Sequence, residues 1–548
     1  MRVNIALFVS LTFTLLLLVL LLPLGDVFIT KVVLGNMLLN KEGSFPLSTV
    51  GGYWAIILLN YRPVSIIVFS VLKNITGLRD YSLLGFPIYA LPTFLLINLI
   101  GIILTKQSYY RKRESEVRII LSITSCIAIV YGFYYFSVSG YHSLSISYLI
   151  LSTYLLLKYM FAANKSTLIL LAVSTTVLLL THQYSTGILI ALITLISIMM
   201  LGYFLLMRII KDINKTFIYF LPIFLVIVFL EVFILPDLDV IAEVGTVDEI
   251  IQSIIDGIRV TILKALRLEV EVPQHLEYMS YLKDVFPIYN TSEIIEGIAK
   301  YLLIALGISF GFLALRRYKT MTRERLLFGT MLFSLSLAIL APAAIYAVYY
   351  RALIILTPWV LVTLLTPIIV GTYTTWNSER KPILFLKNVI RYALLMLVVA
   401  STVLSITARY ELTYVRGRLL DTSTTHLGKV FGDYLPTEST YRILSDHTTS
   451  ANLLLGLVTE LGESGRVFPR NILLEPFGML AYSLNCTHIV QMPRNSILVF
   501  RHDNIKHGLF GEVAQYYVPA DYICFQRIFS DYSLIISVGS NMVFWMQK

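Results

Sequence analysis

The chain has 548 residues, of which 57% are hydrophobic and only 14% are charged, and its formal net charge is +10. A soluble globular protein carries about 25% charged residues and about 45–50% apolar residues. The composition therefore argues against an ordinary soluble enzyme and against a disordered chain. It predicts a polytopic α-helical membrane protein.

Long apolar runs give this prediction its detail. A helix needs about 20 apolar residues to cross the hydrocarbon core of a bilayer. Runs of this kind predict about eleven transmembrane helices. The first is interpreted as a retained helix rather than a signal peptide, because no small-residue cleavage site follows it. The predicted helices lie near residues 5–24, 83–104, 119–137, 143–162, 167–181, 186–207, 217–236, 299–315, 326–346, 352–371 and 390–408.

The connections between these predicted helices alternate in charge. The lysine- and arginine-rich connections are assigned to the cytoplasm by the positive-inside rule. We therefore expect residues 1–408 to form a transmembrane domain in the cell membrane with a cytoplasmic N-terminus, and residues 409–548 to form an extracytoplasmic domain. The positive charge then mainly orients the chain, so no nucleic acid partner is needed to explain it.

The tail at 409–548 is polar and mixed in composition. The segment 449–462 is typical of a helix, and three later segments are typical of strands because Pro, Asn, Asp and Gly separate short apolar runs. Together they predict a small α/β or α+β domain. The predicted strands are 487–491, 496–500 and 533–537.

The chain has three cysteines. Cys126 lies inside a predicted helix and is interpreted as a packing residue. Cys486 and Cys524 both lie in the tail, where an extracytoplasmic location permits a disulfide. Two free buried thiols fit the spacing equally well, because spacing alone does not establish disulfide geometry.

The external loop at 237–298 contains an amphipathic pattern. Apolar residues recur every four positions from Ile250 to Leu266, and polar residues fall elsewhere around the helical wheel. The pattern predicts a helix that either lies in the membrane interface or packs on the outer domain.

The first external loop, 25–82, is long and apolar. Asp26 follows the first predicted helix at once, and two apolar stretches then flank a turn at 43–46. Long loops without secondary structure are uncommon, so two short juxtamembrane helices explain this segment better. The layout resembles the GT-C superfamily of membrane glycosyltransferases. Members have an acidic residue just beyond the first span, two juxtamembrane helices, many further spans and often a C-terminal external domain.

A second element carries the same resemblance. Residues 181–186 read Thr-His-Gln-Tyr-Ser-Thr at the outer end of a predicted helix. Archaeal multispanning proteins of GT-C type carry a similar His-Tyr-Ser-Thr element, relative to which Gln183 is an insertion. The oligosaccharyltransferase branch is a poorer match, because its Trp-Trp-Asp signature is absent from the tail and its paired acidic motif is absent from the first loop.

The resemblance implies transfer of a sugar from a polyprenyl-phosphate donor, such as a dolichyl-phosphate sugar, at the extracytoplasmic face. The acceptor would be a hydroxyl of a glycan or a surface protein, and membrane lipid would be a further partner. The acceptor hydroxyl must lose a proton as it attacks the anomeric carbon, whereas the polyprenyl phosphate leaves already ionised. Such a site needs one base and several groups that bind phosphate.

The resemblance assigns the base to Asp26, whose pKa a membrane interface can raise toward neutrality. The alternative role of Asp26 is to cap the helix that follows it. Arg351 resembles the basic residue that binds phosphate on late spans of the superfamily, since a guanidinium binds phosphate through two donors. The alternative is that Arg351 simply reaches the interface beside Tyr349 and Tyr350.

Three further residues complete the predicted site. His182 and Tyr184 are candidates for hydrogen bonds to the phosphate or the sugar, and Arg62 for a contact with the phosphate. A histidine near a helix end is often structural, and an exposed arginine beside Pro63 is often only solvated.

The sequence also bears on possible cofactors and on alternative functions. No spacing is typical of a metal site, although some relatives use a divalent cation such as Mg²⁺ or Mn²⁺. The sequence has no Walker loop and no GxGxxG motif, which argues against a nucleotide. Two alternative functions are a transporter or flippase for a lipid-linked saccharide, and a noncatalytic assembly factor on a GT-C scaffold.

Overall fold

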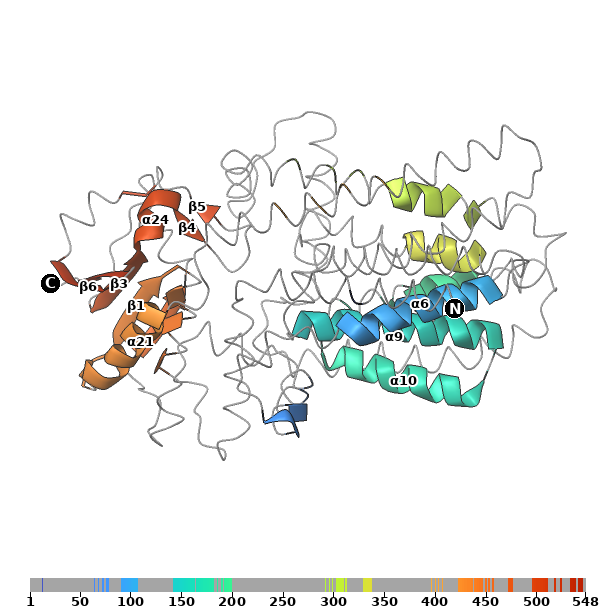
Figure 1. The fold of residues 1–548 in the computed structure, drawn as a ribbon, viewed down its shortest axis with the longest axis horizontal. Helices are drawn as coiled ribbons and strands as arrows, with labels where there is room; N and C mark the ends of the chain where they lie inside the picture. The colour runs from blue at the N-terminus through green and yellow to red at the C-terminus, as the bar shows by residue number, and fades with distance from the viewer. Residues whose placement is uncertain are drawn as a thin grey trace.

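A computed structural model of the chain is drawn in Figure 1. The residues that the structure describes are 12, 64, 68, 71–72, 75–77, 90–106, 141–162, 164–181, 185, 189–190, 192–199, 291, 295, 298, 302–309, 311–312, 329–337, 396, 400, 403, 407, 422–436, 438–446, 449–450, 452–453, 456–457, 472–476, 495–510, 517–518, 523–524, 533–538 and 541–545.

Three helices pack together in the first half of the chain (Figure 1). α6 (Ala90–Lys106) and α10 (Lys165–Leu179) both contact α9 (Tyr141–Ala162). α9 ends at Ala162 and α10 begins at Lys165, so the connection between them is short. A connection of this length makes the two helices antiparallel neighbours. Asn164 caps α10, because its side-chain oxygen accepts a hydrogen bond from the backbone N–H of Ser166 at 3.0 Å.

Hydroxyl groups lie between these helices. Thr93 on α6 and Ser147 on α9 share a hydrogen bond of 2.6 Å, and Ser152 on α9 shares one of 3.0 Å with Ser174 on α10. All four side chains are buried. Each pair therefore fixes the position of two helices relative to each other, in addition to the apolar contacts around it.

The structure contradicts the predicted fold of about eleven transmembrane helices. Within the described ranges, no helix combines the length and the apolar character that crossing a membrane requires. α6 and α10 have 17 and 15 residues, fewer than the roughly 20 of a spanning helix. α9 has 22 residues, but several are Ser or Tyr and one is Lys158. The apolar runs at 83–104, 143–162 and 167–181 do fall on α6, α9 and α10, but counting apolar residues did not show that these helices are too short or too polar to span a membrane.

A mixed sheet forms in the described C-terminal residues, with the strand order β2-β1-β3-β7-β6. β2, β1 and β3 are parallel, and β7 runs antiparallel to both β3 and β6. Separately, β4 (Leu509–Phe510) pairs with β5 (Tyr517–Val518). The strands of the main sheet are β1 (Tyr441–Ser445), β2 (Ile472–Pro476), β3 (Ser496–Arg501), β6 (Ser533–Val538) and β7 (Asn541–Trp545).

The core of this region is centred on β3 and β7. Every residue of β3 is buried, as expected for a central strand. Phe500 on β3 and Phe544 on β7 are almost completely buried, and their rings meet edge to face with centroids 6.1 Å apart. The strands predicted at 496–500 and 533–537 are confirmed as β3 and β6, whereas the strand predicted at 487–491 lies outside the described residues.

α21 (Thr422–Tyr434) packs closely on the segment around Leu453, whose described positions are helical as the sequence predicts. A Cβ atom placed on Gly428 would collide with the carbonyl oxygen of Leu453. A Cβ atom placed on Gly456 would collide with the carbonyl oxygen of Thr425. Two helical backbones therefore touch directly, and glycine is needed at both contact points.

Candidate functional site

The residues that the sequence predicts for the site all lie outside the described residues, so their roles stay predictions. They are Asp26, Arg62, His182, Tyr184 and Arg351. The amphipathic helix predicted near 250–266 also lies outside. The structure does, however, describe the two residues that flank His182 and Tyr184.

Both flanking residues are buried and hydrogen-bonded. Thr181 is buried, and its hydroxyl donates to the backbone carbonyl oxygen of Val177 at 2.6 Å. Ser185 is fully buried, and its hydroxyl donates to the hydroxyl of Ser145 on α9 at 3.4 Å. Of the two, Ser185 contacts a neighbouring helix, α9, whereas Thr181 bonds back to the end of α10, the helix that it follows.

The contact between Ser185 and Ser145 lies near the beginning of α9, which starts at Tyr141. The first turn of a helix has backbone N–H groups without partners in the helix and carries a partial positive charge. This end of a helix favours anions such as phosphate. His142 is also in the first turn of α9, so its backbone lies at the same end of the helix group.

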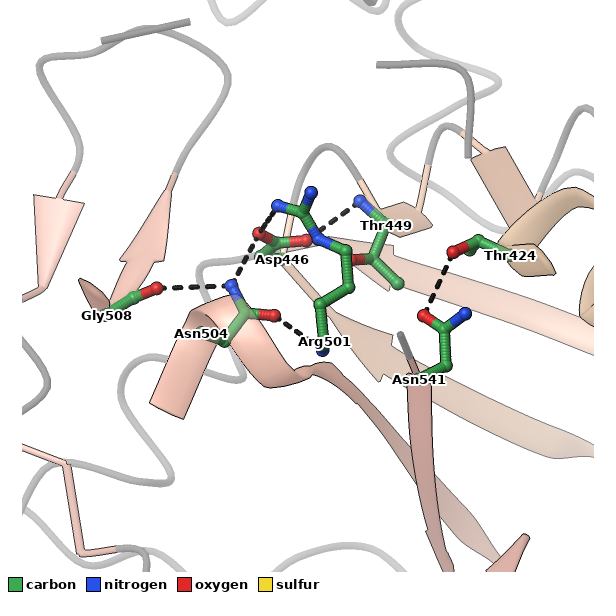
Figure 2. A network of polar contacts seen from close by, with 7 residues as sticks. All are labelled: Thr424, Asp446, Thr449, Arg501, Asn504, Gly508 and Asn541. Atoms are coloured by element: carbon green, nitrogen blue, oxygen red, sulfur yellow. Dashed lines mark hydrogen bonds and ion pairs between the residues drawn. The ribbon is translucent and has the colours of Figure 1, made fainter. Parts of the chain in front are cut away.

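A second group of polar residues lies at the carboxyl ends of two neighbouring parallel strands (Figure 2). Asp446 follows β1 directly, and Arg501 is the last residue of β3. Arg501 Nη2 donates to Asp446 Oδ2 at 3.0 Å, and both side chains are buried. A buried charge is tolerated when it is paired and hydrogen-bonded, and here each charge has the other as its partner.

Asp446 and Asn504 extend this ion pair into a network (Figure 2). Asp446 Oδ1 accepts from the backbone N–H of Thr449 at 2.8 Å, which is the bond of a helix N-cap. Asn504, in α24 (His502–His507), donates from Nδ2 to Asp446 Oδ2 at 2.9 Å and to the carbonyl of Gly508 at 3.1 Å. Its Oδ1 accepts from the backbone N–H of Arg501 at 2.8 Å.

The surroundings of Asp446 act on its pKa in opposite directions. Burial disfavours the ionised carboxylate and raises the pKa, whereas the Arg501 guanidinium and the hydrogen bonds from Thr449 and Asn504 lower it. The balance holds the pKa of Asp446 below its ordinary value of 3.8. The carboxylate is therefore ionised at neutral pH and serves as a hydrogen-bond acceptor.

The position of this network in the sheet is one where ligands often bind. β1 and β3 are neighbours where the strand order reverses, and open α/β sheets bind ligands at the carboxyl ends of such strands. Here Asp446 and Arg501 bond mainly to groups of the chain itself and are almost inaccessible. Arg501 Nε is buried without a partner among the described residues. The network therefore fixes the ends of β1, β3 and α24 and presents no reactive group.

Reasoning from the sequence missed this network, because Asp446 and Arg501 are 55 residues apart. One local signal was present. Asp446 follows a largely apolar run and precedes a helix, which is the typical place of an N-cap residue. Nothing local to Arg501 indicates its partner.

The described part of the chain was compared with the requirements of a metal site and of a disulfide. No three His, Cys, Asp or Glu side chains come together there as a metal site would require. Cys524 is disulfide-bonded. Cys486, with which the sequence allows a bridge, lies outside the described positions, so the predicted pairing stays a prediction.

Comparison with known proteins does not assign the chain to a family. No protein-family model matches it, and no curated protein matches it either. Its function is therefore inferred from its residues and their geometry.

Proposed function

We propose that the protein is a glycosyltransferase that works at a membrane and transfers a sugar from a polyprenyl-phosphate donor to an acceptor hydroxyl on the extracytoplasmic side. The observation that carries this proposal is the burial and hydrogen bonding of the two residues on either side of the segment 182–184 in the sequence. Thr181 and Ser185 are both buried and hydrogen-bonded, and they precede and follow the segment that contains His182 and Tyr184. Catalytic groups need such fixed supports, since small displacements of a positioned group lower the rate strongly.

Each predicted residue has a defined role in this reaction. Asp26 accepts the proton of the acceptor hydroxyl while its oxygen forms the new bond to the anomeric carbon. The bond between that carbon and the phosphate oxygen breaks, and the polyprenyl phosphate leaves as an anion. Arg351 and Arg62 balance the negative charge of the phosphate, and His182 and Tyr184 donate hydrogen bonds to the phosphate or the sugar.

Two observations support the location of the reaction. Cys524 is in a disulfide, and disulfides persist mainly in oxidising, extracytoplasmic environments. Apolar side chains of α10 are exposed at Ile169, Leu170 and Val173, and exposed apolar patches often mark a membrane contact.

The nature of the donor tests this function directly. Membranes that contain the full chain are incubated either with a polyprenyl-phosphate hexose or with a nucleotide-linked hexose, each labelled in the sugar. We expect label to reach the acceptor fraction from the polyprenyl donor alone, with one polyprenyl phosphate released for each sugar transferred. Transfer from the nucleotide sugar instead would contradict the proposal.

A matched pair of histidine variants tests the proposed site in the same assay. We expect His182→Ala to lower the transfer rate about 10- to 100-fold, the value of one hydrogen bond to a charged group. His426→Ala is the control, because His426 is an exposed histidine of α21 outside the proposed site. Equal rates for the two variants would remove His182 from the site.

A further inference from the structure

α10 exposes large apolar side chains, and its buried side chains include hydroxyl groups as well as leucines. Ile169, Leu170 and Val173 are 63%, 55% and 54% exposed. Thr167 and Ser174 are among the buried residues of the same helix. Ile169, Leu170 and Val173 follow the spacing of one helical face, so they form an apolar patch on the outer face of α10. The water-facing side of a helix usually carries charged and polar residues instead.

Hydroxyl groups on such exposed surfaces bond to their own helix. The exposed Thr176, on the outer face of α10, donates to the carbonyl oxygen of Ala172 at 3.0 Å. The exposed Thr76 and Thr407 likewise donate to the carbonyl four residues earlier, at 2.7 Å and 2.9 Å. The donor of each hydroxyl is satisfied without water, as contact with hydrocarbon requires.

Positive charge lies at one end of this face. Lys165 is the first residue of α10, and Lys158 lies one turn before the end of α9, so both flank the short connection between the two helices. Both lysines are exposed, and the ammonium of Lys158 lies 6.0 Å from the ring centre of Tyr154. Residues 141–181 contain no Asp or Glu.

We propose that the outer face of α10, together with Lys158 and Lys165, is a docking surface for anionic phospholipid. The two ammonium groups bind the phosphate of the headgroup, and Ile169, Leu170 and Val173 contact the acyl chains. Phospholipid combines a negative group with hydrocarbon that needs no hydrogen bonds, which is the complement of this surface. The inference deepens the proposed function by naming its lipid partner, and it rests on that function for the membrane location.

The charge part of this surface is tested by flotation of the purified full chain with vesicles. Vesicles are made of phosphatidylcholine alone or of phosphatidylcholine mixed with phosphatidylglycerol. We expect tighter binding to the anionic vesicles, and a loss of about fivefold for Lys165→Gln on those vesicles alone. The double variant Lys158→Gln/Lys165→Gln should lose about 25-fold. Lys506→Gln, at an exposed lysine of α24, should bind like the unaltered chain.

The apolar part is tested by two leucines of nearly equal exposure. Leu170 on α10 is 55% exposed and Leu534 on β6 is 54% exposed. We expect Leu170→Asn to weaken binding to both kinds of vesicle about tenfold, and Leu534→Asn to leave binding unchanged. Equal binding by the two variants, or no effect of the double lysine variant, would overturn the inference.

Two further outcomes keep this inference separate from the proposed function. Dissociation of a homodimer by Leu170→Asn, measured by light scattering, would show that a second copy of the chain covers the face and would also overturn the lipid assignment. Sugar transfer is measured independently with detergent-solubilised donor. Retained transfer with failed lipid discrimination would reject the docking surface alone, whereas retained lipid binding without transfer would reject the glycosyltransferase proposal alone.

Discussion

Arg501 and Asp446 join the carboxyl ends of β3 and β1 through an ion pair of 3.0 Å between Nη2 and Oδ2. The two side chains are buried, and Asn504 donates to the same carboxylate oxygen at 2.9 Å. Because each charge has been removed from water, loss of either partner leaves the other uncompensated in the interior. The stability of the sheet should therefore depend strongly on both Asp446 and Arg501.

The first prediction concerns the charge of Asp446. We expect Asp446→Asn to lower the free energy of unfolding by about 3–5 kcal/mol, because the Arg501 guanidinium remains buried without its counterion. The measurement is denaturant unfolding of the full chain followed by circular dichroism. Asp433→Asn is the control, since Asp433 is an exposed carboxylate of α21. Similar stability of the two variants would mean that the ion pair contributes little.

The second prediction concerns acid. The folded-state pKa of Asp446 is below its ordinary value of 3.8, so folding favours the ionised form. The resulting stabilisation is fully present above that ordinary value and is lost as the pH falls through the lower, folded-state pKa. Acid titration of stability should therefore show a drop below about pH 4 that is smaller in Asp446→Asn. An identical acid profile for both proteins would contradict this.

The third prediction uses two glycines of α21. A Cβ on Gly428 would meet the backbone carbonyl of Leu453, whereas a Cβ on Gly432 would meet only the tip of the Leu457 side chain, at 3.3 Å. We expect Gly428→Ala to destabilise the protein by about 3 kcal/mol or more, because backbone must move. Gly432→Ala should be nearly neutral, since a small side-chain shift is offset by a gain in helix propensity of about 1 kcal/mol.

Thermal unfolding of the two alanine variants side by side gives the comparison. A melting temperature for Gly428→Ala as high as that for Gly432→Ala would show that α21 and the segment around Leu453 are not in backbone contact.

The fourth prediction concerns Ser185 as a positioning residue. Removal of its hydrogen bond to Ser145 should loosen the support of residues 182–184. We expect Ser185→Ala to lower the transfer rate about two- to tenfold. Ser152→Ala is matched, because it removes a hydroxyl from the contact with Ser174 elsewhere on α9. It should lower stability by about 1 kcal/mol and leave the transfer rate unchanged.

If Ser185→Ala and Ser152→Ala lower both the stability and the transfer rate to the same extent, Ser185 contributes only to packing. A KM for the polyprenyl donor that rises in Ser185→Ala alone is the signature of a positioning effect.

Part of the C-terminal fold could be predicted from the sequence, and the physical reason is local. β3 and β6 contain dense apolar runs bounded by turn residues, so their pattern alone indicates strands. β1 and β2 were missed. Their residues are less uniform, and their parallel pairing joins Tyr441 to Ile472 and Arg442 to Ser496 across long connections. Pairing at such distances leaves no local signal.

The transmembrane prediction failed for a related reason. Composition and apolar runs report how much of the chain avoids water, but they do not fix the length of each helix or the polar groups that it buries. Thr93 and Ser147 illustrate this, because two hydroxyls in separate apolar runs satisfy each other inside the helix group. The network of Asp446 and Arg501 is a second example. Charged residues are usually expected at the surface, but these two form an ion pair in the interior.

The most direct test of the proposed function is the transfer rate of Asp26→Asn with a labelled polyprenyl-phosphate sugar. Glu42→Gln is the matched control, because Glu42 is another carboxylate of the segment 25–82 to which no catalytic role is assigned. We expect Asp26→Asn to lower the rate about 100-fold or more, the usual contribution of a general base, and Glu42→Gln to transfer sugar at the unaltered rate. Undiminished transfer by Asp26→Asn would contradict the account.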